Sequence, residues 1–186
     1  MRERRLWLAS LAGAVWLAHA VEVVWRGSPV ELLWMCNVAG LLLTIGCALW
    51  RSSWVAVALS FLVLGTPLWL GDLLAGGELY PTSIGSHLGG IAIGVVASRR
   101  MGWDRHAWWR AELSLLGLVL TTRWLFPAAE DGNVNLAFRV WPGWEAMFTS
   151  YPPYFAFLFV ACGAVFVAVH LAATRWLTTP VLSPAE

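Results

Sequence analysis

The stretch from Trp54 to Leu74 reads WVAVALSFLVLGTPLWLGDLL and decides the class of this protein. Its single charged residue is Asp72, close to the C-terminal end of the stretch. A helix rises 1.5 Å per residue, so about 20 apolar residues cross the roughly 30 Å hydrocarbon core of a bilayer. The stretch therefore predicts a transmembrane helix.

The composition of the whole chain agrees with this interpretation. Of its 186 residues, 59% are hydrophobic and 12% are charged, and the mean hydropathy is +0.68. An ordinary soluble domain is about 25% charged, so this class is excluded. The formal net charge of +1 gives no indication of a nucleic-acid partner. At about 20 residues per span, the length suits six spans in one integral membrane domain, residues 1–186.

Six apolar segments are separated by short stretches rich in Gly, Pro, Ser and Arg, which are typical of turns and loops. The segments are Leu6–Trp25, Val30–Trp50, Trp54–Leu74, Thr82–Ser98, Trp109–Phe126 and Pro153–Ala173. Many of the fourteen tryptophans stand at segment ends, where an amphipathic ring prefers the headgroup zone. The sequence thus predicts an all-α, polytopic membrane bundle of six transmembrane helices.

The arginines orient this bundle. All twelve basic residues are arginines, and cytoplasmic loops carry an excess of basic residues. With a cytoplasmic N-terminus, only Arg26, Arg123 and Arg139 would lie outside. We therefore expect both termini to be cytoplasmic in a multi-pass protein of the cell membrane, of the bacterial inner-membrane type. The basic start could also open a signal peptide, but the apolar run is of spanning length and lacks a small-residue cleavage site, so we interpret it as the first helix.

Several polar residues fall at one depth of the predicted bundle. Cys36 and His87 each lie about five or six residues from the outer end of a segment, or roughly 8 Å deep. Polar groups are costly in hydrocarbon, so several at one depth predict a functional site. The other members of this layer are Glu22, Asn37, Asp72 and Tyr154. We expect a polar pocket near the outer leaflet.

A thiol beside an imidazole forms a nucleophile and its base, and such a pair attacks acyl carbonyls. Cys36 and His87 are therefore the candidate catalytic residues. The candidates for stabilising an oxyanion are Asn37, Asn135 and Tyr154. The candidates for orienting the imidazole are Glu22 and Asp72. The alternative is that Cys36 packs as a small apolar group, as we expect for Cys47 and Cys162.

A metal site is a competing hypothesis. Its available ligands are His19, Glu22, Cys36, Asp72 and His87, but they show no short repeated spacing such as His-x-x-x-His. His19 and Glu22 stand three residues apart on one helical face, where a simple hydrogen-bonded pair is favoured. We therefore expect neither a metal nor a cofactor.

Three stretches carry a resemblance to a known family. They are ELLWMCNV at 31–38, FLVLGTPL at 61–68 followed by Asp72, Tyr80-Pro81 and Ser86-His87, and NVNLAF at 133–138 followed by Pro142 and Tyr151-Pro-Pro-Tyr154. In order and spacing they resemble YwaF-like bacterial integral membrane proteins, the bacterial branch of the transmembrane protein 164 family. The resemblance runs from about Glu31 to Phe166. Trp34 and Leu136 depart from it, since a polar residue and an aromatic residue are usual at those places.

The resemblance implies a function. The animal relative is similar to a membrane acyltransferase that moves fatty acyl chains between phospholipids through a Cys and a His. These two residues correspond to Cys36 and His87, and membrane lipid would be the substrate. The alternatives are a transporter or small-molecule binder, which would need a polar path to the inner face, and a structural membrane protein without a pocket. The loop before the last segment is interpreted either as a lid or as a structured interfacial loop.

Overall fold

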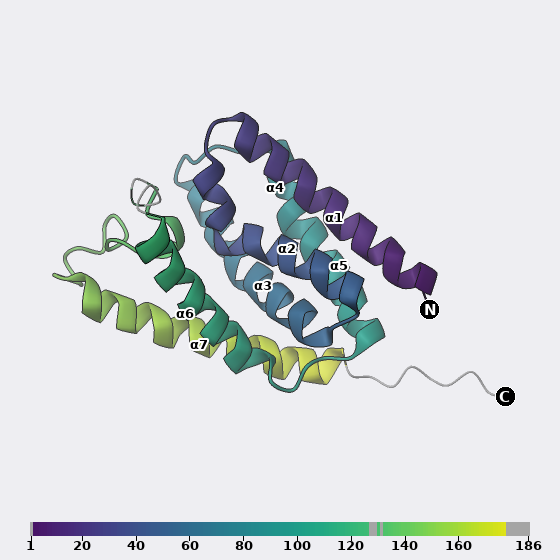
Figure 1. Cartoon of the computed structure of the whole chain (residues 1–186). Coiled ribbons are helices and arrows are strands. Elements are labelled where there is room, and N and C mark those ends of the chain that lie inside the picture. The colour runs from purple at the N-terminus through teal and green to yellow at the C-terminus, as the bar shows by residue number, and fades with distance from the viewer. Residues whose placement is uncertain (1, 127–129, 131, 178–186) are drawn as a thin grey trace.

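The computed structural model describes residues 2–126, 130 and 132–177, with side chains from Leu6 onward. Within these residues the regular structure is entirely helical (Figure 1), which confirms the all-α class. In chain order the elements are α1 (Arg2–Trp25), η1 (Pro29–Leu33), α2 (Met35–Leu49), α3 (Ser52–Leu74), α4 (Pro81–Ile84), η2 (Gly85–Gly89), α5 (Gly90–Met101), α6 (Ala107–Leu125), η4 (Val134–Leu136) and α7 (Tyr151–Trp176).

Three helices of the described chain are long and apolar enough to cross a membrane: α1 from Leu6 onward, α3 and α7. Helix α2 is apolar but has only 15 residues. In α7, the buried side chains are Tyr154, Phe166 and Ala173, so most of its apolar surface faces outward, as in a helix surrounded by lipid. These features are those of a helical membrane protein. The count of six spans stays a prediction.

The structure corrects the second predicted segment, 30–50, which is not one helix. The chain forms the short 3-10 helix η1, breaks at Trp34 and starts again as α2. Trp34 has an extended backbone, with φ −55° and ψ 138°. Such a break exposes backbone N–H and C=O groups, which have to be satisfied by other partners in an apolar environment.

The fourth predicted segment, 82–98, lies within one continuous rod from Pro81 to Met101, in which α4 passes through η2 into α5. The middle element η2 is a π-helical turn. Its i→i+5 hydrogen bonds widen the helix, and such single turns often occur at functional sites. His87 is the third residue of this turn.

Helix α3 is the centre of the molecule and contacts α2, α5, α6 and α7. Figure 1 shows α1, α2 and the α4–α5 rod on one side of α3 and the α6–α7 hairpin on the other. Close packing on the α5 side depends on glycines. A Cβ added at Gly90 would lie 2.9 Å from Leu62 Cδ1, and one at Gly94 would lie 3.1 Å from Leu59 Cδ1. Small residues allow such close approach between membrane helices.

The helix ends separate the arginines into two groups. The start of α1, the α2–α3 turn, the α5–α6 connection and the end of α7 lie toward the same side of the molecule (Figure 1). Among the described side chains this end carries Arg51, Arg99, Arg100, Arg105, Arg110 and Arg175, and the opposite end carries Arg26, Arg123 and Arg139. The fold therefore keeps the asymmetry of charge on which the predicted orientation depends.

The α2–α3 turn provides a test of the packing. A Cβ added at Gly46 would lie 3.0 Å from the backbone nitrogen of Val55, and a backbone atom gives way less easily than a side-chain end. We expect Gly46→Ala to lower the free energy of unfolding by about 1–3 kcal/mol, measured by thermal unfolding of the purified protein in detergent.

Gly117→Ala in α6 is the matched control for this substitution. No described atom outside its own helix turn lies within 4 Å of a Cβ added there. Alanine therefore raises the helix propensity of this position without a clash. We expect the thermal midpoint of this variant to be equal to or above that of the wild type. A lower midpoint for Gly117→Ala than for Gly46→Ala would contradict the described α2–α3 packing.

Candidate functional site

His87 has its ring fixed on two sides. Its Nδ1 lies 2.9 Å from the carbonyl oxygen of Ser83, and its imidazole stacks on Trp69 of α3, with ring centroids 4.4 Å apart and an angle of 8° between the planes. The side chain is only 2% exposed. Because a carbonyl oxygen only accepts, Nδ1 carries the proton and donates it. The Nε2 atom then presents a lone pair, and it has no hydrogen-bond partner among the described residues.

Cys36 is the second residue of α2 and packs against α3. A Cβ added at Gly65 would lie 3.5 Å from Cys36 Cβ. Gly65 precedes Trp69 by four residues, so both lie on one face of α3. Cys36 and His87 therefore approach the same face of α3 about one helical turn apart. No hydrogen bond joins the Cys36 thiol to the His87 imidazole in the described part of the chain, and the catalytic pair stays a prediction.

A polar network joins α1 to the start of α4. His19 Nδ1 lies 2.8 Å from Thr82 Oγ1, and the Thr82 hydroxyl donates to the Glu22 carboxylate. Because that hydroxyl donates its proton to Glu22, it accepts from the Nδ1–H of His19. Glu22 also pairs with Arg26 at 3.2 Å. The sequence pointed to a direct pair of His19 and Glu22, whereas Thr82 stands between them.

Thr82 is the site residue that sequence analysis missed. Its signal was weak, because a threonine at the start of a helix is more often a local cap than a bridge between helices. The useful clue was its predicted depth in the membrane. Thr82 is the first residue of the segment that carries His87, and this depth equals that of the outer end of the first segment. The pairing of that segment with α1 became visible only in the structure.

Asn37 connects the start of α2 to this network. Its Nδ2 donates to the carbonyl oxygen of Glu31 at 2.7 Å. The amide oxygen faces the imidazole of His19 but makes no hydrogen bond of ordinary geometry with any described residue. The unpartnered atom of the amide is thus a buried acceptor. The role of Asn37 in stabilising an oxyanion, which would need a donor, stays a prediction.

Three buried polar atoms without a described partner belong to three elements that contact one another, α2, α3 and η2: Asn37 Oδ1, Thr66 Oγ1 and His87 Nε2. Thr66 stands four residues after Leu62, which faces Gly90, and three residues before Trp69. This helical spacing directs Thr66 toward the same rod as His87. A buried polar group without a partner costs about 1–3 kcal/mol, and native proteins keep few of them. Such a group of atoms is the best candidate in this chain for contact with a polar ligand.

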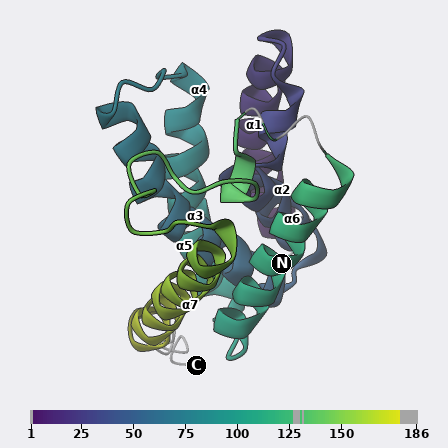
Figure 2. The same cartoon turned by 90° about the vertical axis from the view of Figure 1, so that its left-hand side faces the viewer.

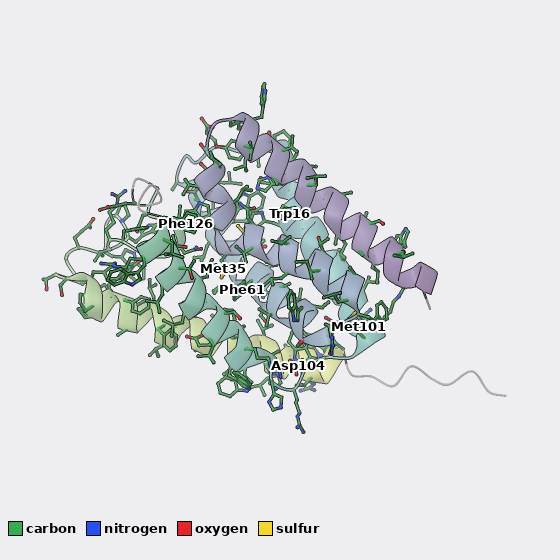
Figure 3. The ribbon with its side chains drawn as sticks, in the orientation of Figure 1. Trp16, Met35, Phe61, Met101, Asp104 and Phe126 are labelled. Atoms are coloured by element: carbon green, nitrogen blue, oxygen red, sulfur yellow. The ribbon has the colours of Figure 1, made fainter. Side chains whose placement is uncertain are left out.

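Asn135 closes the break between η1 and α2. Its Oδ1 accepts from the N–H of Met35 at 2.8 Å, and its Nδ2 donates to the carbonyl oxygen of Leu33 at 2.7 Å and to Thr122 Oγ1 at 3.3 Å. Figure 3 shows Met35 in the interior of the molecule, at the start of α2. Asn135 therefore acts as the cap of α2 from a distant loop. Its donors are engaged there, which leaves its predicted oxyanion role without support from this arrangement.

The loop that carries Asn135 is structured. Asn133 Oδ1 accepts from the N–H groups of Phe138 and Arg139, both at 3.1 Å. Arg123 donates to the carbonyl oxygen of Ala137 at 2.5 Å and lies over the ring of Tyr151, 4.7 Å from its centroid. Figure 2 shows the connection from η4 to α7 running across the end of the molecule. The interpretation as a structured loop thus fits better than that of an open lid.

Two predicted site residues lie away from His87. Tyr154 is buried at 1% exposure in an aromatic cluster with Trp144 and Phe148, and its hydroxyl bonds with the backbone of Trp141. Asp72 is exposed at the end of α3, where its carboxylate folds against Gly77. Neither has a described contact with the network around His19 and His87. In the part of the chain that the structure describes, no three His, Cys, Asp or Glu side chains are grouped to hold a metal ion.

The fold and the site together define a helical membrane protein with a buried histidine site between α1, α2, α3 and η2. No protein-family model, curated protein or solved structure matches the chain. The function is therefore argued from the geometry of the site.

The cap on α2 yields a prediction. Asn135→Ala removes the acceptor for the Met35 N–H and the donor to the Leu33 carbonyl, so we expect the free energy of unfolding to fall by about 1–2 kcal/mol. The first turn of α2 should fray, and Cys36 should react faster with a small maleimide. Thermal unfolding and the rate of alkylation measure the two effects.

Asn135→Asp is the control for the cap. It keeps an oxygen acceptor for the Met35 N–H but places a second oxygen against the Leu33 carbonyl. Stability should therefore fall, while the first turn of α2 stays capped and Cys36 reacts more slowly than in Asn135→Ala. If Asn135→Ala matched the wild type in stability and in thiol reactivity, Asn135 would not hold the start of α2.

Proposed function

We propose that this protein is a membrane-embedded acyltransferase or acyl hydrolase that acts on lipid esters, with Cys36 as nucleophile and His87 as general base. The observation that carries the proposal is the state of the His87 imidazole. Its proton is fixed on Nδ1 by the Ser83 carbonyl, and the buried Nε2 lone pair is without a described partner. This is the arrangement that a general base needs.

The position of Cys36 supports the proposed role of nucleophile. It lies in the first turn of α2, where N–H groups without helical acceptors create a positive potential that favours a thiolate. The backbone N–H groups of Cys36 and Asn37 approach its thiol. A dry environment opposes a free thiolate, so proton transfer to His87 would accompany the attack rather than precede it.

The proposed reaction has two balanced steps. In the first, His87 Nε2 takes the proton of the Cys36 thiol while Sγ bonds to the ester carbonyl carbon. The carbon–oxygen bond to the leaving alcohol then breaks, and that alcohol takes the proton from Nε2, which leaves an acyl thioester on Cys36. In the second, a lipid hydroxyl or water gives its proton to Nε2 and attacks the thioester, and the released Cys36 sulfur takes that proton back. No metal or redox partner takes part.

The donor to the developing oxyanion is assigned to the backbone. Met35 N–H binds Asn135 Oδ1, and Asn37 N–H binds the carbonyl oxygen of Trp34. Between them, the N–H of Cys36 belongs to the first turn of α2 and points out of the helix start. A nucleophile's own N–H at a helix N-terminus is a donor of the kind that stabilises acyl oxyanions. This assignment replaces the side-chain donors expected from the sequence.

A second candidate function is the binding of a polar ligand without chemistry. The unpartnered atoms of Asn37, Thr66 and His87 favour it. Two of these atoms, Asn37 Oδ1 and His87 Nε2, are acceptors that bind a donor group of a ligand without any nucleophile. In this case Cys36 would pack as a small apolar side chain. The experiment below distinguishes the two functions by whether a covalent acyl-protein forms.

The test uses the full chain in proteoliposomes that contain a phospholipid with an alkyne-tagged acyl chain. We expect a tagged acyl thioester on the wild type, released by neutral hydroxylamine and located by peptide mass spectrometry to Cys36. Cys36→Ala should abolish it. His87→Gln should slow its formation by about 100-fold or more, since general base catalysis contributes about 10²–10⁴-fold.

Cys47→Ala and Cys162→Ala are the matched controls. Cys47 lies on α2, as Cys36 does, and Cys162 lies on α7, and neither belongs to the proposed site. Both should acylate at the wild-type rate. The proposal fails if the label persists in Cys36→Ala, or if folded wild-type protein forms no thioester and leaves the lipid ester intact. The latter result favours the binding function.

A further inference from the structure

A cleft lies at the arginine-rich end of the molecule, away from the histidine site. It is open to one side, has a volume of about 470 Å³ and lies between α2, α3 and α6. Figure 3 shows Asp104 at this end, beside the start of α6. Its lining residues are Leu42, Ser53, Trp54, Val57, Trp109, Arg110, Leu113 and Ser114. A concave site of this size is within the range that small ligands occupy.

The cleft changes from polar to apolar along the helices. Ser53 stands in the first turn of α3, and Arg110 in the first turn of α6, so both lie near the mouth. Val57, Leu113 and Ser114 lie about one turn further in,, so the floor is mostly apolar with one hydroxyl. Two tryptophans flank the mouth, Trp54 and Trp109, and they are 40% and 36% exposed. A charged entrance, tryptophan walls and an apolar floor match the order of groups in a phospholipid at a membrane interface.

Arg110 supplies the charge at this mouth. Its NH1 pairs with Asp104 Oδ2 at 2.5 Å, and its guanidinium lies 5.4 Å from the ring of Trp109. A guanidinium has five N–H donors in a planar fork, so the pair with Asp104 uses only part of its capacity. Asp104 is itself held by the N–H of His106 at 3.1 Å. The carboxylate thus fixes the guanidinium and also competes with any anionic ligand.

We propose that this cleft binds one anionic phospholipid, with its phosphate on Arg110 and Ser53 and one acyl chain along Leu42, Val57 and Leu113. Anionic lipids are attracted to basic residues next to membrane helices, with about 1 kcal/mol per residue. The mouth lies at the end that gathers most of the described arginines, and the apolar floor leads away from it along α3 and α6. A soluble anion would use the arginine but not this floor.

The site is independent of the proposed catalysis. Cys36 opens α2, whereas the cleft lies along the second half of α2 and the first turns of α3 and α6. A lipid bound there would bridge the α6–α7 hairpin to α2 and α3. Helix α6 contacts α3, and no helix of the described chain covers the outer side of Leu113, which is 55% exposed.

The test measures lipid binding to the purified full chain in a neutral detergent by native mass spectrometry, with phosphatidylglycerol and phosphatidylcholine of identical acyl chains. We expect bound phosphatidylglycerol with a clear preference over phosphatidylcholine. Arg110→Gln should raise its dissociation constant at least tenfold, which corresponds to about 1.4 kcal/mol. Asp104→Asn should lower it, because a competing carboxylate is removed while the guanidinium stays.

Arg105→Gln is the matched control. It removes the same charge from a position five residues before Arg110 that does not line the cleft. Its dissociation constant should stay within about twofold of the wild-type value. Leu113→Trp fills the apolar floor and keeps every charge, so it should also weaken binding. It tests the site independently if Arg110→Gln does not fold.

Three outcomes would overturn the proposal. They are equal binding of the two lipids, equal losses for Arg110→Gln and Arg105→Gln, and binding of glycerol phosphate as tight as that of phosphatidylglycerol. The first two would indicate unspecific lipid attraction, and the third would indicate a site for a soluble phosphate.

Discussion

Two hydrogen bonds from the side chain of Asn135 hold together a helix that would otherwise start without a cap. They bridge the carbonyl of Leu33 and the N–H of Met35, the two groups exposed by the break at Trp34. In an apolar environment these groups have no water to bind, so the break depends on the amide. The loop before α7, the end of α6 and the start of α2 meet at this amide, which sets the position of Cys36.

Helix α3 provides the second constraint, because both candidate catalytic residues are placed against it. Gly65 lacks a side chain where Cys36 approaches, and Trp69 one turn later gives a flat surface to the His87 imidazole. The Ser83 carbonyl then settles which nitrogen carries the proton. The state of His87 thus results from three elements, α3, α4 and η2, rather than from the histidine alone.

The sequence predicted the helical class and the approximate extent of the segments, because long apolar runs have one physical solution in a membrane. Depth also pointed to His87, whose catalytic role stays a prediction. The sequence did not predict the break at Trp34, since the residue that stabilises it is Asn135, far away in the chain. Tyr154 and Asp72 were expected at the site because they share its depth, but depth does not specify the direction of a side chain. Thr82 was missed for the complementary reason, because its partners belong to α1.

The π-turn at His87 makes the site separable from the scaffold in an evolutionary sense. A residue added to or removed from an α-helix rotates everything beyond it by about 100°, which would take Gly90 and Gly94 away from α3. The wide turn already contains one residue more than α-helical spacing requires,. A deletion between Gly85 and Gly89 would be absorbed there, so that α5 keeps its packing on Leu62 and Leu59 while His87 turns away from Trp69. A lineage can therefore lose this site in one step and retain the fold.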